Sequence, residues 1–358
     1  MTAYKKIFVA SVTALTVLLT AIVSFAKAPY EEVLPPDVVA KYNHYLESYK
    51  ARHIDRGGTV ETLLDMETKT EVVGYWGQWD SQGWTGVTMG AFALQGDWDL
   101  VRTNLSYWPL LEVEPGSYKR HPDHPLDHEF GQTSIDQYGE MIMGIAIVYL
   151  IGPDDLKEEM KRIVTNIINY GNAHDWVFGP GPYTDCKDIK FLFQLFSERM
   201  GLGLDVYAGG EDYESLRKHF FDVMKVAVLI KQTNGNYFTL NLFFERLFVA
   251  RLLKPDLEGF NRALKGWYKV VKDDDNTMFD WFYARIAGKD TAFVIDRLKD
   301  YPENLPNLWE ETGYLWGNRW ERSPEQLSQK PTGEPIEYNG MDFFSLASFY
   351  SYFELHEF

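Results

Sequence analysis

Cysteine is almost missing from this chain, and several familiar signatures are missing altogether. Cys186 is the single cysteine among 358 residues, so no disulfide forms within the chain and a zinc site built on several cysteines is excluded. The sequence has no nucleotide-binding glycine motif, no Gly-x-Ser-x-Gly elbow and no His-Glu-x-x-His motif. No second long apolar run follows residue 26, which predicts a body that is soluble in water.

Positive charge is also scarce. The chain has 35 Lys and Arg against 52 Asp and Glu, a formal net charge of −17. Nucleic-acid binding needs clustered Lys and Arg that contact phosphates, so this balance argues against a nucleic-acid partner. Hydrophobic residues make up 45% of the chain and aromatic residues 16%, which is enough for a large core. Aromatic rings pack in cores and also act as stacking platforms in carbohydrate clefts, and the composition is compatible with either role.

The N-terminus has the pattern of a targeting segment. Lys5 and Lys6 precede an apolar run over 7–25, and residues 24–26 offer a signal-peptidase site. We therefore expect residues 1–26 to be a signal peptide and the protein to be exported to the periplasm or the outside of the cell. The run is almost long enough to span a bilayer, so an uncleaved N-terminal membrane anchor is the alternative.

In residues 27–358 apolar and amphipathic stretches alternate, which predicts a single domain of about twelve helices. Short turns such as Gly152-Pro153 separate the members of each pair. The pattern predicts an all-α (α/α)6 barrel, a six-hairpin toroid in which the first and last helices pair to close the ring. The apolar stretches are 83–95, 134–150, 188–204, 241–253, 276–287 and 341–356, and the amphipathic ones are 35–50, 97–108, 154–170, 212–230, 256–271 and 290–299.

The connections that lead into the apolar helices are long, and such loops on a rigid scaffold commonly carry function. Asp136, near the start of the stretch 134–150, is the first candidate for a general acid, although Ser134 and Gln137 also fit a capping box. Glu140 lies on the same helix face and is the second carboxylate or a partner in an ion pair. Asp80, before stretch 83–95, is the other candidate acid, with an N-cap role as the alternative.

Further candidates come from the polar run 119–128 and from the aromatic residues. His128 is the best placed histidine for acid–base work, and Tyr138 is a candidate base. The three His and two Asp of the run match no metal signature, so we expect no metal and no cofactor. The candidate substrate-binding residues are Trp76, Trp79, Trp84, Trp176 and Tyr183 as ring surfaces, and Lys119, Arg120 and Arg319 as cations for a uronate carboxylate.

The alternation of helices and the segment 131–150 resemble the six-hairpin glycosidase superfamily, and most of all its unsaturated glucuronyl and galacturonyl hydrolases. The resemblance implies that Asp136 is the general acid and base, and that Asp80 matches a second conserved aspartate. The run Tyr183-Thr184-Asp185-Cys186 is similar to a segment of linalool dehydratase-isomerase. That family relies on more than one cysteine, which this chain lacks.

These observations together predict an exported glycoside hydrolase that acts on a polysaccharide or oligosaccharide by carboxylate acid–base catalysis. The alternatives are a polysaccharide lyase that uses Tyr138 or His128 as its base, a dehydratase or isomerase of a small apolar alcohol, and a non-catalytic glycan-binding toroid. The expected partner is a carbohydrate. The sugar, its linkage and the oligomeric state stay open.

Overall fold

The computed structural model describes residues 27–65, 67–68, 71–76, 78–126, 129, 131–207, 211–225, 238–301 and 336–358. This part of the chain is mostly α-helical with a few short strands, so the all-α expectation is confirmed. The segment 1–26, interpreted above as a signal peptide or anchor, lies outside the described residues, as do His128 and Arg319. In the ranges that the structure describes, no helix combines the length and apolar character needed to cross a membrane.

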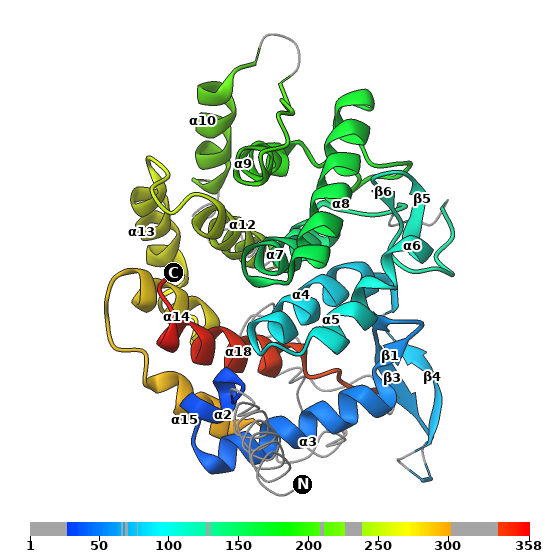
Figure 1. The fold of residues 1–358 in the computed structure, drawn as a ribbon, viewed down its shortest axis with the longest axis vertical. Helices are drawn as coiled ribbons and strands as arrows, with labels where there is room; N and C mark the ends of the chain where they lie inside the picture. Colours follow the sequence, from blue (N-terminus) through cyan, green and yellow to red (C-terminus); the bar gives the residue numbers. More distant parts are fainter. Residues whose placement is uncertain are drawn as a thin grey trace, which may run out of the picture.

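The apolar and amphipathic helices alternate as the sequence predicts. In Figure 1, α4, α7, α12 and α18 lie toward the middle, and α3, α8, α10, α13 and α15 lie around them. The short helices α2 (Pro29–Val33) and α6 (Trp108–Leu111) were not expected. The apolar helices are α4 (Ser81–Leu94), α7 (Ile135–Ile151), α9 (Lys190–Met200), α12 (Phe238–Leu253), α14 (Thr277–Ile286) and α18 (Met341–Leu355). The amphipathic helices are α3 (Pro36–Arg52), α5 (Trp98–Leu105), α8 (Asp154–Ala173), α10 (Tyr213–Met224), α13 (Phe260–Val271) and α15 (Phe293–Asp300).

The hairpin of α7 and α8 shows how the sequence produces this alternation. Every residue of α7 from 137 to 148 is buried, because nearly all are apolar or small and the helix has neighbours on all sides. Gly152 ends α7, and Pro153 is the N-cap of α8 with a backbone angle that suits a helix start. Asp154 and Asp155 then occupy the first turn of α8, where carboxylates favour the helix dipole.

Helices α4 and α7 run parallel and approach each other through glycines. A Cβ atom on Gly86 would lie 2.4 Å from the Cα atom of Met141, and one on Gly144 would lie 2.0 Å from the carbonyl oxygen of Gly86. One helical turn further on, Gly90 faces Gly144 and Ile147. Only residues without a Cβ atom allow this contact. It fixes the N-terminal ends of the two helices side by side.

The first long helix and the last helix of the chain are in contact. Tyr42 of α3 lies 5.3 Å from Phe344 of α18 between ring centroids, and Tyr45 lies 4.4 Å from Phe343. Lys41, also on α3, is buried and donates hydrogen bonds to the carbonyl oxygens of Leu298 and Lys299 at the end of α15. A cation at this position satisfies carbonyl groups that the helix itself leaves unpaired.

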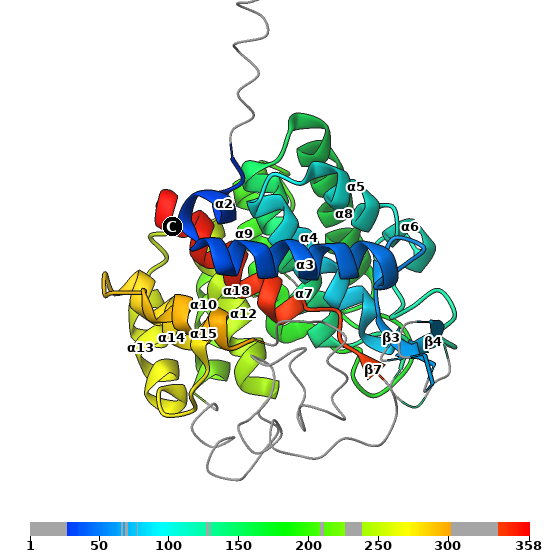
Figure 2. The ribbon, with the colours of Figure 1, turned by 90° about the horizontal axis from the view of Figure 1, so that it is seen from below.

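The connection between α3 and α4, expected to be a plain loop, contains short strands. β1 (Ile54–Asp55) pairs with β2 (Gly58–Thr59). β3 (Glu61–Leu64) lies between β4 (Val72–Trp76) and β7 (Ile336–Glu337) in an antiparallel sheet, which Figure 2 shows at one edge of the molecule. A third pair joins β5 (Glu112–Glu114) to β6 (Ser117–Tyr118).

A buried carboxylate joins β7 to α3. Glu337 accepts hydrogen bonds from Arg52 at 2.6 and 2.7 Å and from Ser48 at 2.7 Å, and His53 lies 3.6 Å away. Burial alone would raise the pKa of Glu337, but His53, Arg52 and Ser48 outweigh it and lower this pKa to about 2. The ionised carboxylate therefore fastens the strand before α18 to the C-terminal end of α3.

Candidate functional site

Two aspartates from separate elements meet at one side-chain amide. Asp80 ends the 3-10 turn η1 (Gln78–Asp80), and Asp136 lies in the first turn of α7. The Nε2 atom of Gln137 lies 3.2 Å from Oδ1 of Asp80 and 3.4 Å from Oδ2 of Asp136. The structure thus brings together the two acids that the sequence singled out, because α4 and α7 start side by side.

The orientation of the Gln137 amide is set by a backbone group of the neighbouring helix. The amide N–H of Gly83, in the first turn of α4, donates to Oε1 of Gln137 at 3.0 Å. Because Oε1 is committed to this donor, the NH2 group must face the carboxylates. Sequence reasoning treated Gln137 only as part of a capping box and missed this role. Its position next to Asp136 was the available signal.

Arg120 forms an ion pair with Asp80, one of the two aspartates. Its guanidinium group is buried and contacts Oδ1 of Asp80 at 3.0 Å, the carbonyl oxygen of Trp79 at 3.3 Å and the hydroxyl group of Ser134 at 2.5 Å. This cation stabilises the ionised form of Asp80. Among the residues that the structure describes, Asp136 has no ion pair. The two carboxylates therefore sit in different electrostatic surroundings.

Neither alternative interpretation by helix capping holds. Asp80 and Ser134 occupy the N-cap positions of α4 and α7, but neither side chain accepts a capping hydrogen bond. Asp80 instead binds Arg120 and Gln137, and its side chain is 45% exposed. An exposed carboxylate that is held on its inner side remains accessible to a ligand at the helix ends.

The loop after β6 is held in place by two buried histidines. His121 lies 3.3 Å from Asp55, and its Nδ1 atom accepts a hydrogen bond from the backbone of Asp123. Burial and Arg56 lower the pKa of His121, which favours the neutral ring. His124 contacts the carbonyl oxygen of Gly131 at 2.8 Å. The ring of Trp79, the residue before Asp80 in the sequence, lies against His124, with centroids 5.0 Å apart.

Two predicted catalytic residues lie deeper than expected. Tyr138 is fully buried, donates to the carbonyl oxygen of Gly116 and accepts from the backbone of Tyr118. Burial raises its pKa well above the usual value, so the proposal of Tyr138 as a catalytic base is corrected to a structural role. Glu140 is also buried, and it packs against Gly83, where a Cβ atom would lie 2.1 Å from Oε2. The carboxylate that shares the Gln137 amide with Asp136 is Asp80.

The predicted substrate-binding residues divide into core and surface residues. Trp84 and Trp176 are 3% and 1% exposed, so the expectation that they stack on a substrate is corrected, because they fill the core. Arg120 is committed to Asp80 and Ser134, which removes it as a partner for a substrate carboxylate. Tyr183 is 56% exposed, and Lys119 is half-buried with its ammonium group on the carbonyl oxygen of Pro122.

The structure does not describe the side chains of the remaining predicted residues, Trp76, His128 and Arg319. Trp76 ends β4, and its side chain is not described, while His128 and Arg319 lie outside the described residues. In the ranges given above, no three His, Cys, Asp or Glu side chains group together in a way that would hold a metal ion.

Comparison with known proteins identifies no relative of this chain. No protein-family model, no curated protein and no solved structure matches the chain. The resemblance to six-hairpin glycosidases therefore rests on the sequence pattern alone.

Proposed function

We propose that this protein is an exported glycoside hydrolase with an (α/α)6-barrel fold, and that Asp80 and Asp136 form its catalytic pair. The fold proposal is supported by the alternation of apolar and amphipathic helices and by the parallel packing of α4 on α7. It is also supported by the contacts between α3 and α18, which join the two ends of the described helical order.

The observation that carries the proposal is the shared amide of Gln137. The Nε2 atom of Gln137 lies 3.2 Å from the Asp80 carboxylate and 3.4 Å from the Asp136 carboxylate, while Arg120 pairs with Asp80 and not with Asp136. Glycoside hydrolysis uses two carboxyl groups with different protonation states on either side of the scissile bond. Unequal surroundings of this kind are how proteins separate the two roles.

The proposed roles follow from these surroundings. Asp80, which pairs with Arg120, orients water or stabilises positive charge at the anomeric carbon. Asp136, half-buried near the start of α7, protonates the leaving oxygen or the double bond of an unsaturated uronyl unit. Gln137 keeps both carboxylates in place and donates a hydrogen bond to each.

Two residues that are not fully buried, Trp79 and Lys119, are the proposed substrate contacts. Trp79 precedes Asp80 in the sequence, and its half-buried ring, which packs against His124, is our candidate for stacking on a sugar. The ammonium group of Lys119 contacts the carbonyl oxygen of Pro122 and forms no ion pair within the described residues. Lys119 remains our candidate for binding a uronate carboxylate.

The burial of Tyr138 and Cys186 argues against a lyase based on Tyr138 and against a dehydratase or isomerase based on Cys186. A lyase based on Tyr138 would need a phenol that is accessible and easily ionised, whereas this phenol is buried and tied to backbone groups. A dehydratase or isomerase that depends on Cys186 would need a reactive thiol, whereas this thiol is fully buried and its pKa is raised well above the usual value by burial.

The test is a screen of uronate-containing polysaccharides and unsaturated uronyl oligosaccharides with the purified mature protein. Hydrolysis produces reducing ends and consumes the double bond of an unsaturated substrate, whereas a lyase creates a new double bond. We expect the first outcome, and we expect its loss in Asp136→Asn. Binding without cleavage would instead support a glycan-binding toroid, and new double bonds would support a lyase. Sequencing the N-terminus of the exported protein tests cleavage after residue 26.

A further inference from the structure

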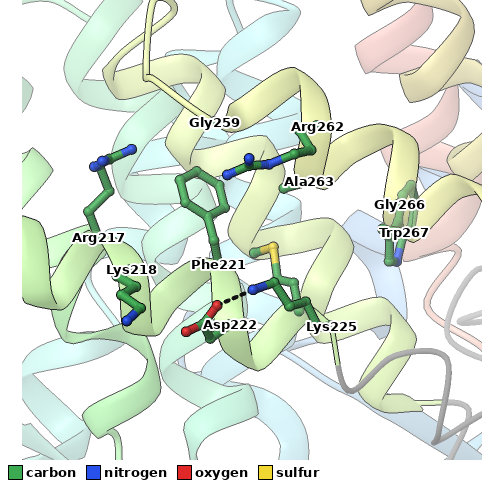
Figure 3. A pocket seen from close by; sticks show the side chains of 11 residues that line it. Arg217, Lys218, Phe221, Asp222, Lys225, Gly259, Arg262, Ala263, Gly266 and Trp267 are labelled. Carbon is green, nitrogen blue, oxygen red and sulfur yellow. Dashed lines mark hydrogen bonds and ion pairs between the residues drawn. The ribbon is translucent and has the colours of Figure 1, made fainter.

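A groove between α10 and α13 has an apolar floor and a basic rim. It has a volume of about 450 Å³ and is lined on the α10 side by Arg217, Lys218, Phe221 and Met224. Gly259, Arg262, Ala263, Gly266 and Trp267 line the α13 side. Figure 3 shows the Phe221 ring in the middle, with Arg217 and Lys218 on one side and Arg262 on the other. The volume is in the range of sites for small organic ligands.

The positive charge of this groove stands out in a chain whose net charge is −17. Lys225 pairs with Asp222, and Arg217 pairs with Glu214. Lys218 and Arg262 are exposed and form no ion pair within the described residues. An adjoining hollow shares Arg262 and Gly266 and adds Lys265 and Lys269, which extends the row of cations along α13.

The groove exists partly because α13 carries a glycine at its wall. Gly266 lies within the helix, and a Cβ atom built on it would meet nothing within 4 Å. Glycine lowers the stability of a helix interior relative to alanine. No turn or close backbone contact requires it here, so its effect is to leave space beside Ala263 and Trp267.

We propose that this groove binds an amphiphilic organic anion, with a carboxylate, sulfonate or phosphate head on one of the rim cations Lys218 and Arg262 and an apolar body over Phe221 and Met224. The charges of the rim select the head, because charge-assisted hydrogen bonds to Lys and Arg are the strong ones. The apolar floor selects the body. This site is separate from the aspartate pair, and the proposal does not depend on the hydrolase function.

The test is a fluorescence titration of the mature protein with anilinonaphthalene sulfonate. N-phenyl-1-naphthylamine serves as the uncharged analogue, and laurate as a competitor. We expect the sulfonate to bind at one site per chain, to be displaced by laurate and to bind much more tightly than the uncharged amine. Binding should weaken with added salt, because exposed charges are screened. Equal binding of the two dyes, or no binding of the sulfonate, would overturn the proposal.

Variants locate the binding in the groove. The double variant Lys218→Gln, Arg262→Gln should bind the sulfonate at least about tenfold more weakly. Gly266→Leu should abolish binding by filling the groove, whereas Gly266→Ala should retain it. Lys157→Gln, on α8, is the control for the loss of a surface charge and should bind as the wild type does. Unchanged affinity in both the double variant and Gly266→Leu would show that the dye binds elsewhere, and would contradict the proposal.

Discussion

Gly144 of α7 lies against Gly86 of α4 so closely that a Cβ atom on Gly144 would be 2.0 Å from the carbonyl oxygen of Gly86. This contact joins two helices that are buried along most of their length, and it sets the spacing of the helix ends that carry Asp80 and Asp136. The packing of the core and the geometry of the candidate site therefore depend on the same glycines.

The first prediction concerns this contact. Gly144→Ala should lower the free energy of unfolding by about 3 kcal/mol or more, because the new methyl group meets backbone atoms that cannot move without shifting a helix. Gly266→Ala is the matched control. It should leave stability unchanged or raise it by up to about 1 kcal/mol, since that Cβ meets nothing. Denaturant unfolding of both variants checks this, and equal stabilities would contradict the described packing.

The second prediction concerns Glu337, whose pKa is lowered to about 2. A lowered pKa in the folded state means that the unfolded chain binds more protons, so the stabilisation is complete above about pH 4.5 and is lost as the pH falls toward 2. Glu337→Gln should therefore reduce the free energy of unfolding by about 3 kcal/mol at pH 7.

Denaturant titrations at a series of pH values test this. The difference between the wild type and Glu337→Gln should shrink as the pH falls toward 2. Glu158→Gln removes a carboxylate whose side chain is 70% exposed and should change stability by less than about 0.5 kcal/mol. A difference for Glu337→Gln that did not depend on pH would argue against an ionised Glu337 paired with Arg52.

The third prediction concerns Cys186. Because the thiol is fully buried and burial raises its pKa, iodoacetamide should not modify the native protein but should modify it completely in denaturant. Mass spectrometry of the two samples measures this. Cys186→Ala should retain glycan cleavage. Rapid alkylation of the native protein, together with loss of activity in Cys186→Ala, would revive the dehydratase interpretation.

The sequence predicted the helices well because the signals that set them are local. The apolar run of α7, the stop at Gly152-Pro153 and the one-sided pattern of α8 all lie within one hairpin. The sheet was missed because its pairing is not local. Thr62 of β3 pairs with Glu337 of β7, far along the chain, and strands of two residues leave no periodic pattern.

The candidate site was predictable only in part. Asp80 and Asp136 were identified because each precedes or starts an apolar helix. The link through Gln137 depends on the N–H group of Gly83 in another helix, which no local pattern reveals. Composition does not distinguish aromatic rings of the core from those of a cleft, so the sequence predicts a substrate-binding role for Trp84 and Trp176, which fill the core.

The most direct test of the catalytic proposal is a kinetic comparison of Asp136→Asn and Asp80→Asn on a glycan that the wild type cleaves. Asp155→Asn, which changes an exposed aspartate paired with Arg102, is the control. We predict that each of the first two substitutions lowers kcat/KM by about a hundredfold or more while the control stays near wild type. Asp136→Asn with kcat/KM within a few-fold of wild type would contradict the assignment of the acid.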